Sequence, residues 1–257
     1  MASWAGGFGR IIAPRGGCRV TRRGTLWFGW TLAVLAIAGF TALGFWQYGR
    51  MHEKEALLAR VDRALHDRSP RALDGNTAGI HWVEGDGRIE ARTLLLDNQI
   101  HAGRPGVRVY CVVDAGPSGH RLVDFGWLPV GGDRTLPDAA CPAGPMHVRG
   151  LMAPPPSSGI RMGAPMQQLA PDRWLMARVD LDAIANALHV RLPPAVVRLD
   201  PALPGGYARD LDILPNTLPP ARHLGYAVQW WGLALAVLVT ALLLTFRSNR
   251  RSRAIRP

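Results

Sequence analysis

Two long apolar runs, one near each end of the chain, dominate its hydropathy pattern. The first covers residues 25–46 and the second residues 224–246, and neither contains a charged side chain. A helix needs about 20 apolar residues to cross the hydrocarbon core of a bilayer. The pattern therefore predicts two transmembrane helices, at residues 25–46 and 223–246. The first run is longer than the apolar core of a cleavable signal peptide, and no small-x-small cleavage site follows it.

The patterns between these runs predict a folded domain at residues 47–222. Leucine and valine recur at helical spacing over residues 57–65, so the first helix is expected to continue, or restart, as an amphipathic helix that ends before Pro70. Short strand-like runs separated by turn residues follow at 80–84, 88–96, 107–113, 121–128, 146–152, 174–179 and 195–199. Asp180 is expected to cap a short helix that ends at Leu188. The five prolines of residues 200–220 indicate mostly a linker.

The predicted fold class is therefore an α+β membrane protein, with two transmembrane helices flanking an extracytoplasmic, mainly antiparallel β domain that also contains short helices. Basic residues predict its orientation. Five Arg and no acid lie in residues 1–24, and five Arg and no acid lie in residues 247–257. Short basic segments stay in the cytoplasm, so we expect two cytoplasmic tails and a periplasmic domain in a bacterial inner membrane. The Arg-rich start also resembles a transit peptide, which keeps the mitochondrial inner membrane as the alternative.

The formal charge of +11 does not indicate a nucleic-acid partner. Residues 50–222 carry all 19 acidic side chains against 20 basic ones, so the excess charge lies in the two tails. A nucleic-acid-binding face needs its basic residues on the folded domain. The lipid bilayer is the partner that this charge distribution predicts.

Enzyme motifs are missing from the sequence. It contains no nucleophile elbow, zinc-protease motif, Walker loop or dinucleotide-binding glycine motif after a strand, and its eight His are scattered singly. Cys111 and Cys141 are expected on the oxidising side of the membrane, where a disulfide is allowed, but their spacing does not decide whether they pair. No closely spaced Cys pair supports a copper or thiol redox centre. We predict no enzyme activity.

Polar and aromatic side chains gather at the expected outer ends of both membrane helices. They are Trp46, Gln47, Tyr48 and Arg50 on the first helix and Arg222, His223, Tyr226, Gln229 and Trp230 on the second. If the helices pack, these side chains form a half-polar, half-aromatic pocket that suits haem. An imidazole can bind the iron, Arg can pair with the propionates and aromatic rings can cover the macrocycle. The simpler interpretation is an interfacial anchor of Trp, Tyr and Arg, which is common in membrane helices.

Both helix ends resemble signatures of a known family. Residues 43–50 and 54–57 resemble the first-helix signature of the Surfeit-one family of cytochrome c oxidase assembly factors, and residues 223–230 resemble its second-helix signature. Four further segments follow in the family's order, at 95–99, 103–106, 126–129 and 148–151 with Pro154. The likeness covers roughly residues 40–240. One departure is Phe125, which stands where the family usually has Arg before Gly-Trp, so any role of that Arg is absent here.

The resemblance implies an assembly factor that helps haem a reach the catalytic subunit of a haem-copper cytochrome c oxidase. In family members proposed to bind haem a, the second-helix His is a candidate iron ligand, and it corresponds to His223. The expected partners are the catalytic subunit and haem a synthase. Two alternatives stay open. One is a cofactor-free scaffold that stabilises an oxidase subunit intermediate, and the other is a membrane-anchored periplasmic enzyme or copper-handling protein that uses Cys111 or Cys141.

Overall fold

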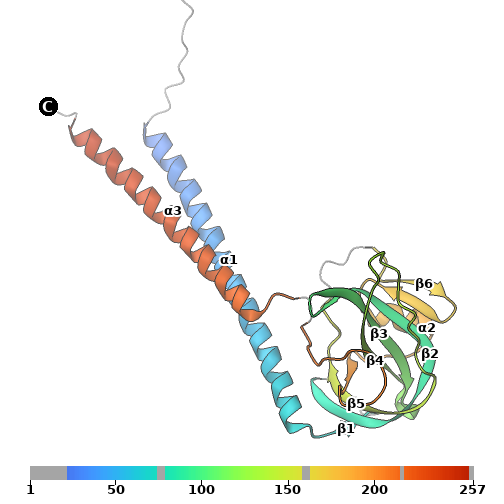
Figure 1. Ribbon diagram of the computed structural model, residues 1–257. Coiled ribbons are helices and arrows are strands. Elements are labelled where there is room, and N and C mark those ends of the chain that lie inside the picture. The colour runs from blue at the N-terminus through green and yellow to red at the C-terminus, as the bar shows by residue number, and fades with distance from the viewer. Residues whose placement is uncertain (1–21, 74–78, 158–162, 215–216, 255–257) are drawn as a thin grey trace, which may run out of the picture. The chain divides into compact units, whose positions relative to one another are not determined.

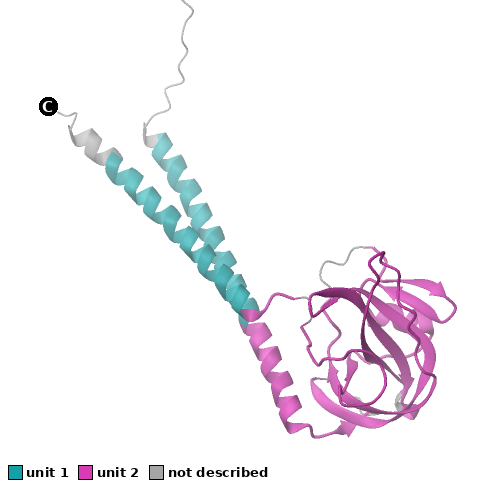
Figure 2. Ribbon diagram, in the orientation of Figure 1, with its two compact units in different colours: residues 1–51, 221–257 teal, residues 52–220 magenta. Residues whose placement is uncertain are grey.

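The computed structural model describes residues 22–73, 79–157, 163–214 and 217–254 (Figure 1). The chain divides into two compact units, which Figure 2 shows in different colours. Unit 1 consists of residues 1–51 and 221–257, and unit 2 consists of residues 52–220. The boundary at residue 51 falls inside a helix, so one helix contributes to both units.

Unit 1 is built from the first part of helix α1 (Arg22–Asp67) and from helix α3 (Pro220–Ala254). Both helices are long and apolar enough to cross a membrane. Large apolar side chains point outward along them, with Trp27 77% exposed and Leu244 62% exposed. Apolar side chains on lipid-facing helices have no reason to be buried, because hydrocarbon surrounds them. The two predicted apolar helices are therefore confirmed, and they are compatible with a membrane protein.

Unit 2 is built around an eight-stranded sheet. Its strands are β1 (Arg71–Ala72), β2 (His81–His101), β3 (Arg104–Asp114), β4 (His120–Pro129), β5 (Gly144–Ala153), β6 (Met166–Ala170), β7 (Arg173–Met176) and β8 (Val196–Leu199). The strand order is β3-β4-β8-β5-β2-β7-β6, and β2 also pairs with β3. The strands β2, β3, β4, β8 and β5 therefore close into a barrel (Figure 1).

Strand β2 is long enough to pair with two different strands of this barrel. Its first half, His81–Ile89, pairs with β5, and its residues from Arg88 onward pair with β3. The sequence predicted a turn at Gly85–Gly87 between two separate strands, and this prediction is wrong. An added Cβ at Gly85 would lie 2.8 Å from Leu73, and one at Gly87 would lie 2.5 Å from Val113. These glycines allow neighbouring chains to approach where the strand passes between its two partners.

The sheet is mixed, and this corrects part of the predicted mainly antiparallel pairing. The pairs β2–β3, β3–β4, β2–β5, β5–β8 and β6–β7 are antiparallel, whereas β1–β2, β2–β7 and β4–β8 are parallel. Parallel neighbours require long connections, and β7 and β8 are reached by such connections. Strands β1 and β6 were not predicted. The short helix is confirmed as α2 (Leu181–Leu188), where Asp180 Oδ1 accepts from the Ala183 amide at 3.2 Å.

Three apolar clusters stabilise unit 2. The largest fills the barrel and includes Val83, Leu95, Val109 and Val123, and a second lies between the outer face of the sheet and α2. The third joins Val61 of α1 to Trp82 and Leu151, which confirms that α1 continues as an amphipathic helix as far as Asp67.

A disulfide between Cys111 and Cys141 lies in the largest cluster, with the two Cα atoms 5.7 Å apart. Cys111 is on β3, and Cys141 lies near the end of residues 130–143, which have neither helix nor strand and precede β5. The bridge therefore fastens this segment to the barrel. The structure thus settles the pairing that the sequence spacing left open.

The segment expected to be a linker has neither helix nor strand at residues 200–214, but it is bound firmly to the sheet. Arg108 donates to Asp124 Oδ2 at 2.9 Å and to both carboxylate oxygens of Asp210 at 2.8 and 2.9 Å. Arg198 donates to the Asp212 carbonyl at 2.6 Å. Burial opposes the charge of Arg108, but the carboxylates of Asp124 and Asp210 outweigh it and raise the pKa of Arg108. The segment is therefore part of the domain.

Candidate functional site at the helix pair

The two candidate membrane-spanning helices are joined by a hydrogen bond between His223 of α3 and Gln47 of α1. His223 Nδ1 lies 2.7 Å from Gln47 Oε1, across 176 residues of sequence. An amide oxygen only accepts, so the imidazole Nδ1–H donates, and the neutral ring then carries its lone pair on Nε2. A histidine that donates from one ring nitrogen is oriented to bind a metal through the other. His223 is only 7% exposed, so this bond lies inside the helix pair.

Close packing beside this bond comes from a glycine and from aromatic rings. A Cβ added to Gly44 would lie 2.2 Å from the indole nitrogen of Trp231, so only glycine fits there without displacing the indole. Phe40 stacks on Trp230 with ring centroids 5.5 Å apart, and Phe45 contacts Trp231 edge to face. Trp230 was predicted as a site residue, whereas Gly44 and Trp231 were not. The available signal was a small residue within an apolar run, because such residues let membrane helices approach closely.

The other predicted site residues lie on the outward surfaces of the two helices. Trp46 is 58% exposed and Tyr226 is 37% exposed, and Arg50 and Arg222 are also exposed. The structure therefore brings together His223, Gln47 and Trp230 at the contact between the helices. It places the remaining four at the helix surface, where interfacial anchors also lie.

The comparison with protein families identifies the chain. Residues 34–235 match the model described as the SURF1 family, a range that includes most of α1, the first part of α3 and the whole sheet. The chain belongs to the SURF1 family. This is the Surfeit-one family of cytochrome c oxidase assembly factors, so the oxidase is the partner that membership implies. A comparison with curated proteins gave no match.

In this SURF1-family chain, the two signature segments meet in space. Residues 43–50 and 223–230 lie on different helices, and Gln47 and His223 connect them directly. Phe125, which departs from the usual family residue, is buried in the apolar interior of the barrel. The Gln47–His223 hydrogen bond thus links the two signature segments, which lie near the beginning and the end of the matched region.

The donor chemistry at His223 fits a haem iron. An imidazole whose Nδ1 is held by Gln47 can bind a metal through Nε2, and aromatic rings lie one to two turns further along α3. Histidine is a common axial ligand of haem, and a hydrogen bond from its other nitrogen fixes the ring orientation. Because His223 is almost fully buried, access to Nε2 requires movement of the side chains that cover it.

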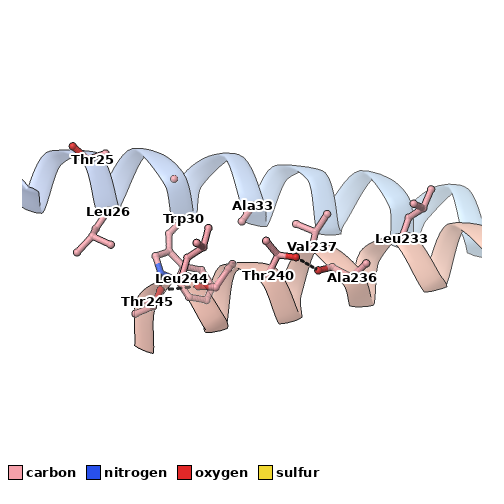
Figure 3. A pocket seen from close by; sticks show the side chains of 12 residues that line it. Thr25, Leu26, Trp30, Ala33, Leu233, Ala236, Val237, Thr240, Leu244 and Thr245 are labelled. Atoms are coloured by element: carbon pink, nitrogen blue, oxygen red, sulfur yellow. Dashed lines mark hydrogen bonds between the residues drawn. The ribbon is translucent and has the colours of Figure 1, made fainter. Parts of the chain in front are cut away.

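A groove of about 550 Å³ lies further along the same two helices (Figure 3). It is lined by residues of α1 between Thr25 and Ala33 and of α3 between Leu233 and Thr245. Trp30 Nε1 donates to Thr245 Oγ1 at 3.0 Å across it, as Figure 3 shows. No lining residue carries a titratable side chain, so its surface suits apolar groups.

The remaining histidines of the described chain do not form a metal centre. No group of three or more His, Cys, Asp or Glu side chains there is arranged to hold a metal ion. His147 is flanked by Glu84 and Asp86, each 2.8 Å from one ring nitrogen, and these two hydrogen bonds raise the pKa of His147. The copper-handling alternative needed free thiols, whereas Cys111 and Cys141 are joined to each other.

Proposed function

We propose that this SURF1-family protein assists the delivery or protection of haem a at the catalytic subunit of cytochrome c oxidase, with His223 as the residue that would bind the iron. The observation that carries the proposal is the His223–Gln47 hydrogen bond, which orients the imidazole with its lone pair on Nε2. Both residues belong to the segments by which the chain resembles its family.

The other residues of the helix ends have roles in this proposal that follow from their chemistry. Bound haem a would supply the metal and the macrocycle. Arg50 and Arg222 would pair with its propionates, because guanidinium groups form charge-assisted hydrogen bonds with carboxylates. Trp46, Tyr226 and Trp230 would cover the ring. We further propose haem a synthase as the source of the haem.

The location that we propose is a bacterial inner membrane, with both termini in the cytoplasm and unit 2 in the periplasm. The Arg-rich, acid-free ends of the sequence support this orientation. The buried Cys111–Cys141 pair also supports it, because disulfides persist in oxidising compartments such as the periplasm. Alkaline phosphatase fusions at the two ends should be inactive, and a fusion within unit 2 should be active. Ends on opposite sides would contradict this orientation.

The haem proposal is tested on protein purified in detergent from cells that also make haem a. The wild type should show a haem absorption spectrum, and His223→Ala should lose most of it. His147→Ala is the matched control, because it removes an exposed histidine from the sheet domain. An unchanged spectrum in His223→Ala would exclude His223 as the ligand.

A cofactor-free scaffold is the second candidate function, and the burial of His223 favours it. A buried histidine that forms a hydrogen bond with the opposite helix also stabilises the packing of the two helices. In that case the purified wild type would carry no stoichiometric haem under any expression condition, while still co-purifying with oxidase subunits. Deleting the gene would then reduce oxidase assembly.

A further inference from the structure

A hollow on unit 2 lies where the end of α1 meets the first strands of the sheet. Its volume is about 350 Å³, and its lining includes Arg60 and Arg63 of α1, Arg71 of β1 and the neighbouring Ile80 and Trp82. Figure 1 shows β1 following directly after the end of α1. The hollow therefore combines basic side chains from two elements with an apolar floor.

The basic side chains around this hollow lack acidic partners. Arg60, Arg63 and Arg71 are exposed, and none of them has a carboxylate within 4 Å among the described residues. The Nε atoms of Arg60 and Arg63 donate to backbone carbonyls one turn earlier in α1, at 3.2 Å each, so the Nη groups remain as donors. A fourth guanidinium, that of Arg68, lies 5.0 Å from the centre of the Trp82 ring.

This arrangement differs from that of other arginines in the same unit. Arg108 and Arg149 each have a carboxylate oxygen within 3 Å, and residues 50–222 are almost balanced in charge. Among the described residues that line the hollow, one is acidic, Asp67. The three arginines of the hollow therefore differ from Arg108 and Arg149, whose charges are neutralised by neighbouring carboxylates.

Helix electrostatics do not explain this cluster. Basic side chains in the last turn of a helix interact favourably with its dipole, but in α1 that residue is His66, and Arg60 and Arg63 precede the last turn. Arg71 lies on a strand, and that argument does not apply to it. Burial is the main cause of the lowered pKa of the adjacent His81, and the charge of Arg71 lowers it further. An anionic ligand would reduce the mutual repulsion of the arginines around the hollow.

We propose that this hollow is a docking site for an acidic segment of a partner polypeptide, whose carboxylates pair with Arg60, Arg63 and Arg71. The three guanidinium groups are spread over two elements, which matches several carboxylates along a chain better than one compact anion. The apolar floor formed by Ile80 and Trp82 matches the methylene groups of acidic side chains. The SURF1 family acts on a protein complex, which favours a polypeptide occupant. This proposal does not depend on haem binding.

The test uses full-length protein in neutral detergent and a fluorescein-labelled hexaglutamate peptide, followed by fluorescence anisotropy. The wild type should bind hexaglutamate but not hexaglutamine, and added salt should weaken binding. The double variant Arg60→Gln/Arg63→Gln and the single variant Arg71→Gln should each weaken binding by up to about tenfold, because a hydrogen bond to a charged group is lost. The matched control Arg191→Gln, which changes an exposed arginine outside the hollow, should bind as the wild type does.

Several results would overturn the proposal. Absence of hexaglutamate binding by the wild type would do so, as would an equal loss in Arg191→Gln. Competition by inorganic phosphate at concentrations similar to those of the peptide would instead indicate a small-anion site. A further result would indicate that the hollow binds a lipid surface. In that case the wild type would not bind the peptide, but it would bind vesicles containing phosphatidylglycerol and not vesicles of pure phosphatidylcholine. The arginine variants would lose this vesicle binding. A circular dichroism melt of each variant confirms that the fold is retained.

Discussion

Removing the disulfide between Cys111 and Cys141 should lower the free energy of unfolding of unit 2 by about 3.6 kcal/mol. This figure is the loop-closure estimate for the sequence separation of 30 residues. The bridge ties β3 to the end of residues 130–143, which contain neither helix nor strand. Without it, this segment is released in the unfolded chain, and its ordering in the folded state costs more conformational entropy.

The measurement is a urea titration of the full-length protein in detergent, followed by near-ultraviolet circular dichroism. At a urea dependence of about 2 kcal/mol/M, the midpoint should fall by about 2 M in the double variant Cys111→Ala/Cys141→Ala. Reduction of the wild type should produce a similar fall. The control Cys18→Ala, which leaves both bridged cysteines in place, should unfold at the wild-type midpoint.

Two outcomes would refute this reasoning at different points. If neither reduction nor the double substitution moves the midpoint, the bridge does not stabilise the native sheet domain. If alkylation of rapidly acid-quenched cells finds Cys111 and Cys141 as free thiols, the domain does not mature in an oxidising compartment, and the proposed periplasmic location loses its structural support.

Three further predictions test the helix pair and the sheet domain. Gly44→Ala should lower the thermal stability in detergent and shift the tryptophan emission, because its Cβ would collide with Trp231, whereas Gly49→Ala, with nothing within 4 Å, should do neither. Asp180→Ala should destabilise unit 2 by about 1 kcal/mol in urea, because the cap of α2 is lost, and no change would contradict the capping role. The carboxylates beside His147 raise its pKa above 6.5, so its stabilisation is complete below that value and is lost as the pH rises through the raised pKa. His147→Ala should therefore cost more stability near pH 5.5 than near pH 8.5, by less than about 1 kcal/mol because the ring is half exposed, and equal costs would contradict the argument.

Several features of the fold could be predicted from the sequence because they depend on neighbouring residues. The length and apolar character of residues 25–46 and 224–246 are sufficient to specify helices that suit hydrocarbon. The repeat over residues 57–65 continues α1 into unit 2, and Asp180 has the acceptor that a helix start requires. For the candidate site, the sequence named His223, Gln47 and Trp230 from their position at the helix ends. Whether they bind haem a stays a prediction.

The remaining features were decided by contacts between segments far apart in the chain. Local pattern could not show that β2 runs through Gly85–Gly87, because the close approach of Leu73 and Val113 requires those glycines. It also could not show that β7 runs parallel to β2 and β8 runs parallel to β4, or that residues 200–214 are bound to the sheet through the Arg108–Asp210 ion pair.

The same limit applies to the pairs that matter most for function. The Cys111–Cys141 bridge and the Gln47–His223 bond connect residues 30 and 176 positions apart. Hydrophobic periodicity specifies which side of an element is buried, and it therefore determined the helices and most strands of this protein. It does not specify which element lies opposite. Two distant elements pack together when the free energy gained from their contacts exceeds the entropic cost of closing the loop between them. The tertiary structure shows which elements do so.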